Sequence, residues 1–161
     1  MKKLIGLLLF AIIMVTACDN SEDEEVKPNV FKFKVNGVEK DYSANIDVDF
    51  VDLFELTTIS ASDGKDTLQI ELNSTSTGTF ETPEQFSLLD NGLRYMSGDY
   101  SFTTVTSHDT VEYTINISTY TGMADEVEGT FSGRLRHSNY DFLNPYDSVI
   151  TITSGEFYVT K

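Results

Sequence analysis

Residues 30–42, VFKFKVNGVEKDY, decide the fold class of this 161-residue chain. Phe31, Phe33 and Val35 alternate with lysines, and a period of two places apolar and polar side chains on opposite faces of a strand. Strands of this kind bury one face in a core and leave the other in water, as is common in antiparallel sheets. The segment therefore predicts a β-sheet protein.

The first strand ends at Asn36-Gly37, a pair that readily adopts the two positive φ angles of a type I′ turn. A two-residue loop of this type pairs Val35 with Val38. The returning strand then places Val38 and Tyr42 on the same buried face as the phenylalanines of the first strand. The chain is expected to open with a β-hairpin.

The same alternation returns along the chain, with turn-forming residues between the segments. Eight or nine short strands without a long helical period predict an all-β fold, an antiparallel β-sandwich, with a lipocalin-like β-barrel as the alternative. One short helix is expected at most, over residues 83–89. The later apolar positions are Ile46, Val48, Phe50, Leu68, Ile70, Leu72, Tyr100, Phe102, Val111, Tyr113, Ile115, Ile117, Val127, Phe131, Leu135, Ile150, Ile152, Phe157 and Val159.

Glycines mark two special places in the last strands. The apolar residues before and after Ser154-Gly155 are out of step by one position, which a β-bulge at this pair restores. Gly129 and Gly133 share a strand face with Phe131, and this spacing predicts a close approach of backbone or aromatic rings.

The N-terminus has the outline of a secretory signal peptide. Lys2 and Lys3 precede an uninterrupted apolar segment, Leu4–Val15, and Asp19 brings the next charge. A membrane-spanning helix is the alternative, but it needs about 20 apolar residues, and this segment is shorter. A signal peptide over residues 1–17 is therefore expected.

Val15-Thr16-Ala17-Cys18 resembles the lipobox of bacterial lipoproteins, in which a cysteine is acylated and becomes the mature N-terminus. The resemblance implies lipidation at Cys18, and two or three acyl chains bind a membrane far more firmly than one. Cys18 is the only cysteine, so the exported domain has no disulfide and depends on its core.

Five of the seven residues in 19–25 are acidic, and like charges at this density keep a segment extended. Residues 18–29 therefore form the lipidated cysteine and an acidic tether that reaches roughly 35 Å. Residues 21–25 also resemble the export signal of Bacteroidota surface lipoproteins. That resemblance implies a lipid-anchored, surface-exposed protein of the outer membrane; a plain solvated spacer is the alternative.

The charge of the chain restricts its partners. Removing residues 1–17 takes away Lys2 and Lys3, so the formal net charge changes from −15 to −17. Phosphate backbones and anionic lipid surfaces repel such a chain, which makes nucleic acid an unsuitable partner. Residues 30–161 have the size of one all-β domain with its own core.

Four strand-and-turn patterns occur in order along the domain, at residues 33–37 (FKVNG), 98–102 (GDYSF), 129–133 (GTFSG) and 152–159 (ITSGEFYV). In these landmarks the chain resembles a family of small, mostly uncharacterised Bacteroidota surface lipoproteins. The resemblance implies an architecture and brings no catalytic residues with it.

Residues that carry chemistry are sparse. His108 and His137, the two histidines, lack metal-ligand spacing, and no nucleophile motif accompanies them. Asp47 and Asp49 share a strand face and belong to an acidic group with the chemistry of a calcium site, but exposed, mutually repelling carboxylates explain them better. We expect no catalytic residue, no metal and no cofactor, and therefore a protein that is not an enzyme.

A long loop that begins at residue 138 carries Tyr140, Phe142 and Tyr146 between two strands, and loops of this length are often functional. The expected function is a lipid-anchored envelope protein whose non-catalytic β domain binds a glycan or an envelope protein, with these aromatics as the binding residues. Rings that cover the end of the sandwich are the structural alternative. A lipocalin-like carrier of a small hydrophobic ligand and a small glycan-acting hydrolase are the functional alternatives.

Overall fold

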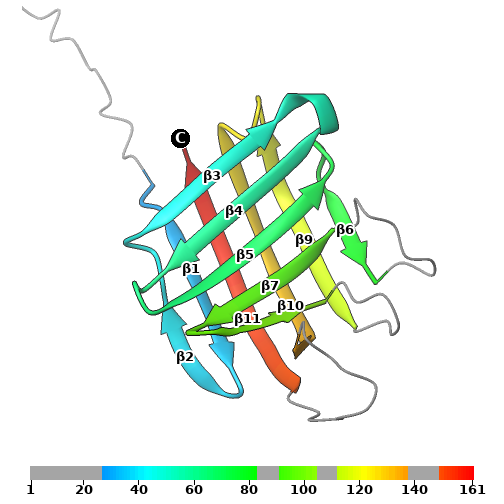
Figure 1. Ribbon diagram of the computed structural model, residues 1–161. Helices are drawn as coiled ribbons and strands as arrows, with labels where there is room; N and C mark the ends of the chain where they lie inside the picture. The colour runs from blue at the N-terminus through cyan, green and yellow to red at the C-terminus, as the bar shows by residue number, and fades with distance from the viewer. Residues whose placement is uncertain (1–26, 83–90, 105–111, 138–148) are drawn as a thin grey trace, which may run out of the picture.

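The computed structural model describes residues 27–82, 91–104, 112–137 and 149–161 (Figure 1). These residues form eleven antiparallel β-strands and one short 3₁₀ helix, η1 (Asp52–Phe54), so the all-β prediction is confirmed. The predicted number of strands, eight or nine, was too low. The strands are β1 (Val30–Val35), β2 (Val38–Asp41), β3 (Ile46–Val51), β4 (Leu56–Ser62), β5 (Asp66–Asn73), β6 (Gly78–Glu81), β7 (Gly92–Ser97), β8 (Tyr100–Thr103), β9 (Tyr113–Thr121), β10 (Glu126–His137) and β11 (Val149–Thr160).

All these strands belong to one continuous sheet that curls into a half-barrel. Its order is β2-β1-β11-β10-β8-β7-β5-β4-β3, and β9 and β6 extend the sheet from β10. The long strand β10 pairs with β9 along most of its length and with β8 at Arg136 and His137. Figure 1 shows the result: β3, β4, β5 and β7 cross in front of β1, β11, β10 and β9. The two halves face each other as layers, and their continuity matches the barrel-like alternative.

The opening hairpin forms as predicted. Asn36 and Gly37 have φ angles of +50° and +83°, which is the type I′ pattern, and Val35 lies opposite Val38. Tyr42 is buried together with the phenylalanines of β1, but the prediction for Val38 was wrong, because this residue is 63% exposed. Figure 1 shows why: the tip of the hairpin projects past the strands that cover its base.

The β-bulge in β11 is confirmed. The register between β10 and β11 shifts where Ser132 lies opposite Thr153 and Ser154, and Ser154 has a φ angle of +52°. The same shift appears where β1 pairs with β11. Because of the bulge, the apolar side chains at both ends of the strand point into the core.

Aromatic rings and aliphatic side chains fill the space between the two halves. The ring of Phe131 lies 5.5 Å from that of Phe31 and 6.2 Å from that of Phe157, measured between centroids. Glycines make room for these rings: a Cβ on Gly129 would lie 2.9 Å from the Phe157 ring, and one on Gly155 would lie 2.6 Å from the Phe131 ring. The predicted close approach at Gly129 is therefore confirmed.

Both ends of the described chain lie at one end of the half-barrel, together with η1 and the turn between β9 and β10 (Figure 1). The amide of Lys161 donates a hydrogen bond to the carbonyl oxygen of Asp125 in that turn, at 3.0 Å. The hydroxyl groups of Thr57 and Tyr120 are hydrogen-bonded at 2.6 Å and link the start of β4 to the end of β9. We call this part of the molecule the terminal end.

Candidate functional site

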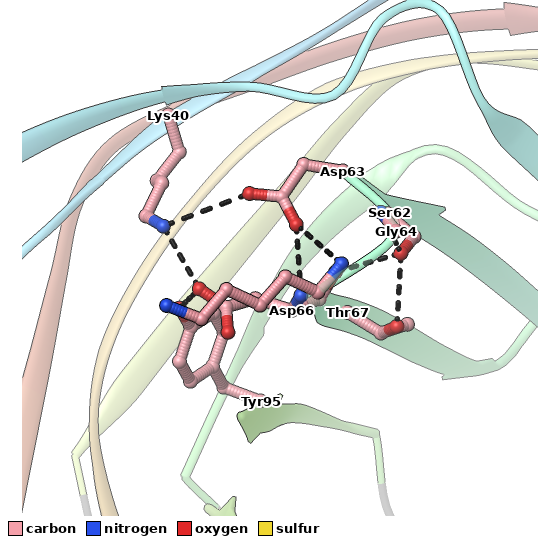
Figure 2. Close-up of polar contacts among 8 residues, drawn as sticks. Lys40, Ser62, Asp63, Gly64, Asp66, Thr67 and Tyr95 are labelled. Atoms are coloured by element: carbon pink, nitrogen blue, oxygen red, sulfur yellow. Dashed lines mark hydrogen bonds and ion pairs between the residues drawn. The ribbon is translucent and has the colours of Figure 1, made fainter. Parts of the chain in front are cut away.

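A charged cluster joins the edge strand β2 to the hairpin of β4 and β5 (Figure 2). The Oδ2 atom of Asp66 accepts hydrogen bonds from the Nζ of Lys40 and the hydroxyl of Tyr95, both at 2.8 Å. A second carboxylate, Asp63, lies 3.8 Å from the same Nζ. Three strands that are distant in sequence thus meet at one carboxylate.

The turn between β4 and β5 holds these carboxylates in place. Asp63 accepts hydrogen bonds from the backbone amides of Lys65 and Asp66, at 2.9 and 2.8 Å. Ser62 donates its hydroxyl to the carbonyl oxygen of Asp66 at 2.7 Å, and Gly64 has a φ angle of +85°. Short polar side chains that bond their own backbone are typical of tight turns, which explains why the sequence SDGKD folds in this way.

The electrostatics of the cluster fix its protonation states. Burial raises the pKa of Asp66, but hydrogen bonds from Lys40 and Tyr95 outweigh this effect and lower the pKa to about 2. The hydrogen bond to Asp66 also raises the pKa of Lys40 above its usual range, and burial raises the pKa of Tyr95 strongly. None of these three groups gains or loses a proton at equilibrium near neutral pH. The cluster therefore suits a structural clamp better than acid–base catalysis.

The outer face of the sheet carries a different kind of site, in which polar and charged side chains from five strands line up. One row lies across β6, β9, β10, β11 and β1, and neighbouring strand spacings give it a length of roughly 19 Å. All its members are exposed, and each lies opposite the next in the strand register. The row consists of Thr79, Asn116, Thr130, Glu156 and Lys32.

A second row runs beside the first, two residues further along the strands. It consists of Glu81, Thr114, Ser132, Thr153 and Lys34. We call the two together the polar rows. They combine hydroxyl, amide, carboxylate and ammonium groups, so they offer both donors and acceptors along a nearly continuous strip.

Two shallow grooves hollow this face. The first has a volume of 320 Å³ and lies along Thr130, Glu128 and Tyr158; the second, of 260 Å³, lies along Thr114, Ser132 and Arg134. In the first groove the ammonium group of Lys27 lies 3.7 Å from the centroid of the Tyr158 ring and 2.6 Å from a carboxylate oxygen of Glu128. Lys27 covers the buried Tyr158 ring, so this groove presents charged groups and the hydroxyl of Thr130 to a polar ligand.

Several residues predicted from the sequence lie outside the described residues: Cys18, Tyr140, Phe142, Tyr146 and His108. The expected helix at 83–89 lies outside them as well. The structure does describe His137, whose ring packs edge-on against Phe102 and Tyr100, with centroids 5.5 and 5.6 Å apart. Asp47 and Asp49 are exposed on β3, as expected for solvated carboxylates. Among the residues that the structure describes, no three metal-ligating side chains come together.

Sequence reasoning missed the charged cluster, although a signal for it was present. On β5, Asp66 shares the alternation of Leu68, Ile70 and Leu72, which all face the core. Lys40 precedes the buried Tyr42 by two residues and therefore lies on the same face of its strand. A carboxylate and an ammonium group on core-facing positions of two strands indicate an ion pair across the fold.

Comparisons with known proteins yield no relative. No family model, no curated protein and no solved structure matches the chain. Within the described ranges, no helix has the length and apolar character needed to cross a bilayer.

Proposed function

We propose that this chain is a lipid-anchored protein of the cell envelope whose β domain binds a glycan along the polar rows. The observation that carries the binding part is the exposed row from Thr79 to Lys32, in which five neighbouring strands each present one polar side chain at the same level. A polymer of sugars presents hydroxyl groups at regular intervals, and side chains that both donate and accept hydrogen bonds complement them. The neighbouring groove adds the ion pair of Lys27 and Glu128.

Anchoring rests on the N-terminal sequence, in which an apolar segment ends at Cys18 and an acidic tether follows. Replacing Cys18 with Ala is expected to abolish acylation and to release the protein from the membrane fraction. Labelled fatty acid that still attaches to the Cys18→Ala protein would overturn the lipoprotein assignment. Surface exposure on the outer membrane is part of the same proposal and is supported by residues 21–25.

The charged cluster fits a structural role within this proposal, because the carboxylate, ammonium and phenol groups keep their protonation states near neutral pH. The carrier alternative requires an open lumen between the two halves of the sheet. Packed aromatic rings occupy that region instead, with Phe33 lying 6.0 Å from Phe131 and 6.4 Å from Tyr95 between centroids. A filled core favours recognition on the outer face.

A glycan array probed with the detergent-solubilised mature protein tests the proposal. Replacing both Asn116 and Thr130 with Ala is expected to weaken binding at least tenfold, because each loses a side-chain hydrogen bond. The control is Thr58→Ala, which alters a partly exposed threonine on β4, in the other half of the sheet. Binding that is unchanged in the double variant but lost in a Tyr140→Ala, Tyr146→Ala variant would move the site to the loop and overturn the role of the polar rows. Turnover of a chromogenic glycoside that depends on one carboxylate would overturn the non-enzymatic proposal.

A further inference from the structure

Large apolar side chains are exposed at the terminal end. In η1, Leu53 is 83% exposed and Phe54 is 50% exposed, while Met123 in the turn between β9 and β10 is 61% exposed. Single exposed apolar residues are normal. Here three large ones lie on two turns at the same end of the molecule (Figure 1), so one flat surface approaching that end can meet all three. We call Leu53, Phe54 and Met123 the apolar tip.

The local structure of η1 keeps these side chains away from the core. None of its residues is buried, and the helix ends at Glu55, which has a φ angle of +50° and donates its amide to the carbonyl oxygen of Asp52 at 3.2 Å. Positive φ is uncommon for a residue with a side chain and indicates a constrained turn. The fold therefore presents Leu53 and half of the Phe54 side chain to the surroundings.

The N-terminal segment enters the domain at the same end. Val30 is paired with Tyr158 near the end of β11, and Lys27 lies over the Tyr158 ring. The ammonium group of Lys161 donates a hydrogen bond to the carbonyl oxygen of Met123, at 3.4 Å. The C-terminal residue therefore lies beside the apolar tip. Cys18 precedes Lys27 by nine residues, so an acyl group on Cys18 is at most about 30 Å from the domain.

We propose that the apolar tip inserts into the surface of the bilayer that holds the acyl chains of Cys18. The proposal rests on the lipid anchoring proposed above. Leucine, phenylalanine and methionine side chains partition into the boundary between headgroups and acyl chains, whereas the carboxylates of Asp52 and Glu55 stay at the level of the headgroups. The domain then stands on the membrane at its terminal end, with the tip of the opening hairpin pointing away from it.

The absence of tryptophan from the chain allows a direct test. A Leu53→Trp variant of the mature lipidated protein is reconstituted in phosphatidylcholine vesicles with and without brominated acyl chains. The matched control is Val38→Trp, because Val38 is 63% exposed and lies at the opposite end of the molecule. We expect blue-shifted emission and at least twofold stronger quenching by brominated lipid for Leu53→Trp than for Val38→Trp. Both positions are exposed, so the variants are expected to retain the fold, and circular dichroism checks this.

The outcomes separate the two proposals. Absence of labelled fatty acid on Cys18 would overturn the anchor and the tip contact together. Labelled Cys18 with equal quenching at both positions would overturn the tip contact alone. A blue shift without quenching would indicate a protein contact, for instance with a second copy, and would also overturn it. Added phosphatidylglycerol is expected to reduce quenching of Leu53→Trp, because Asp52 and Glu55 repel anionic headgroups. Stronger quenching in vesicles that contain phosphatidylglycerol would contradict the proposed position of these carboxylates at the headgroup level.

Discussion

Replacing Asp66 with Asn removes one negative charge from the cluster between β2 and β5 and keeps the shape of the side chain. In the native protein this side chain is 6% exposed and accepts two hydrogen bonds, from Lys40 and Tyr95. Asn retains an oxygen that accepts both bonds but has no charge to pair with the ammonium group. The substitution therefore measures what the ionised state of Asp66 contributes to folding.

The magnitude follows from the pKa of Asp66, which the fold lowers from 3.8 to about 2. A difference of this size corresponds to a contribution to stability on the order of 2 kcal/mol, since one pKa unit equals about 1.4 kcal/mol. Because the folded-state pKa is the lower one, the contribution is complete above pH 4. It is lost as the pH falls through the folded-state value.

Urea unfolding at several pH values checks this expectation. Relative to the native protein, Asp66→Asn is expected to lose about 2 kcal/mol at pH 6, about 1 kcal/mol at pH 3 and less than about 0.5 kcal/mol at pH 2, where protonated Asp66 resembles Asn. The control, Asp49→Asn, alters an exposed carboxylate on β3. A loss for Asp66→Asn that stays constant from pH 6 to pH 2 would refute the assignment of the charge state.

Three further predictions concern the core, the first turn and the tether. Gly129→Ala is expected to lower the free energy of unfolding by about 1–3 kcal/mol, because its Cβ would overlap the carbonyl oxygen of Asn116 and crowd the Phe157 ring; an unchanged urea midpoint would contradict this packing. Gly37→Val places a β-branched side chain at a φ angle of +83° and is expected to cost about 1–3 kcal/mol, measured by thermal unfolding. Neutralising the acidic residues of 22–25 to Ala is expected to leave anchoring intact and to reduce surface display. Protease accessibility on whole cells measures the last effect, and unchanged accessibility would make the segment a spacer.

Alternating patterns predicted the strands whose two faces differ strongly in polarity. They missed the strands whose faces differ little. In β5, Leu68, Ile70 and Leu72 face the core between polar neighbours, and this strand was found from the sequence. In β4 the core-facing residues include Thr57 and Ala61, which differ little in polarity from their neighbours. The short edge strand β6 and the strand β7 were missed for a related reason, since only one large apolar residue of β6 and two of β7 pack in or against the core.

The sequence placed Lys40 and Asp66 on core-facing positions, but it could not show which strands of the two halves of the sheet meet. The pairing of Lys40 with Asp66 joins β2 to β5, and it depends on how far the sheet curls before these strands meet. The polar rows depend on register across five strands, including the bulge at Ser154-Gly155. The sequence indicated that bulge but not the partners it brings into line. The apolar–polar alternation within a strand thus predicts which face of the strand is buried. The curvature and register of the sheet determine which side chains become neighbours.

The outermost strands of the sheet affect whether copies of this protein associate with one another. Among the described residues, β2, β3 and β6 each pair on one side only. A free strand edge is a template for joining a second molecule, and the hazard grows when lipid anchors confine molecules to two dimensions. On β2, Asp41 and Glu39 are ion-paired with Lys32 and Lys34 of β1, at 3.8 and 3.3 Å. On β3, Asp47 and Asp49 are exposed and place negative charge along that edge. Like charges on two approaching β3 edges repel, so we expect this edge to resist joining a second copy.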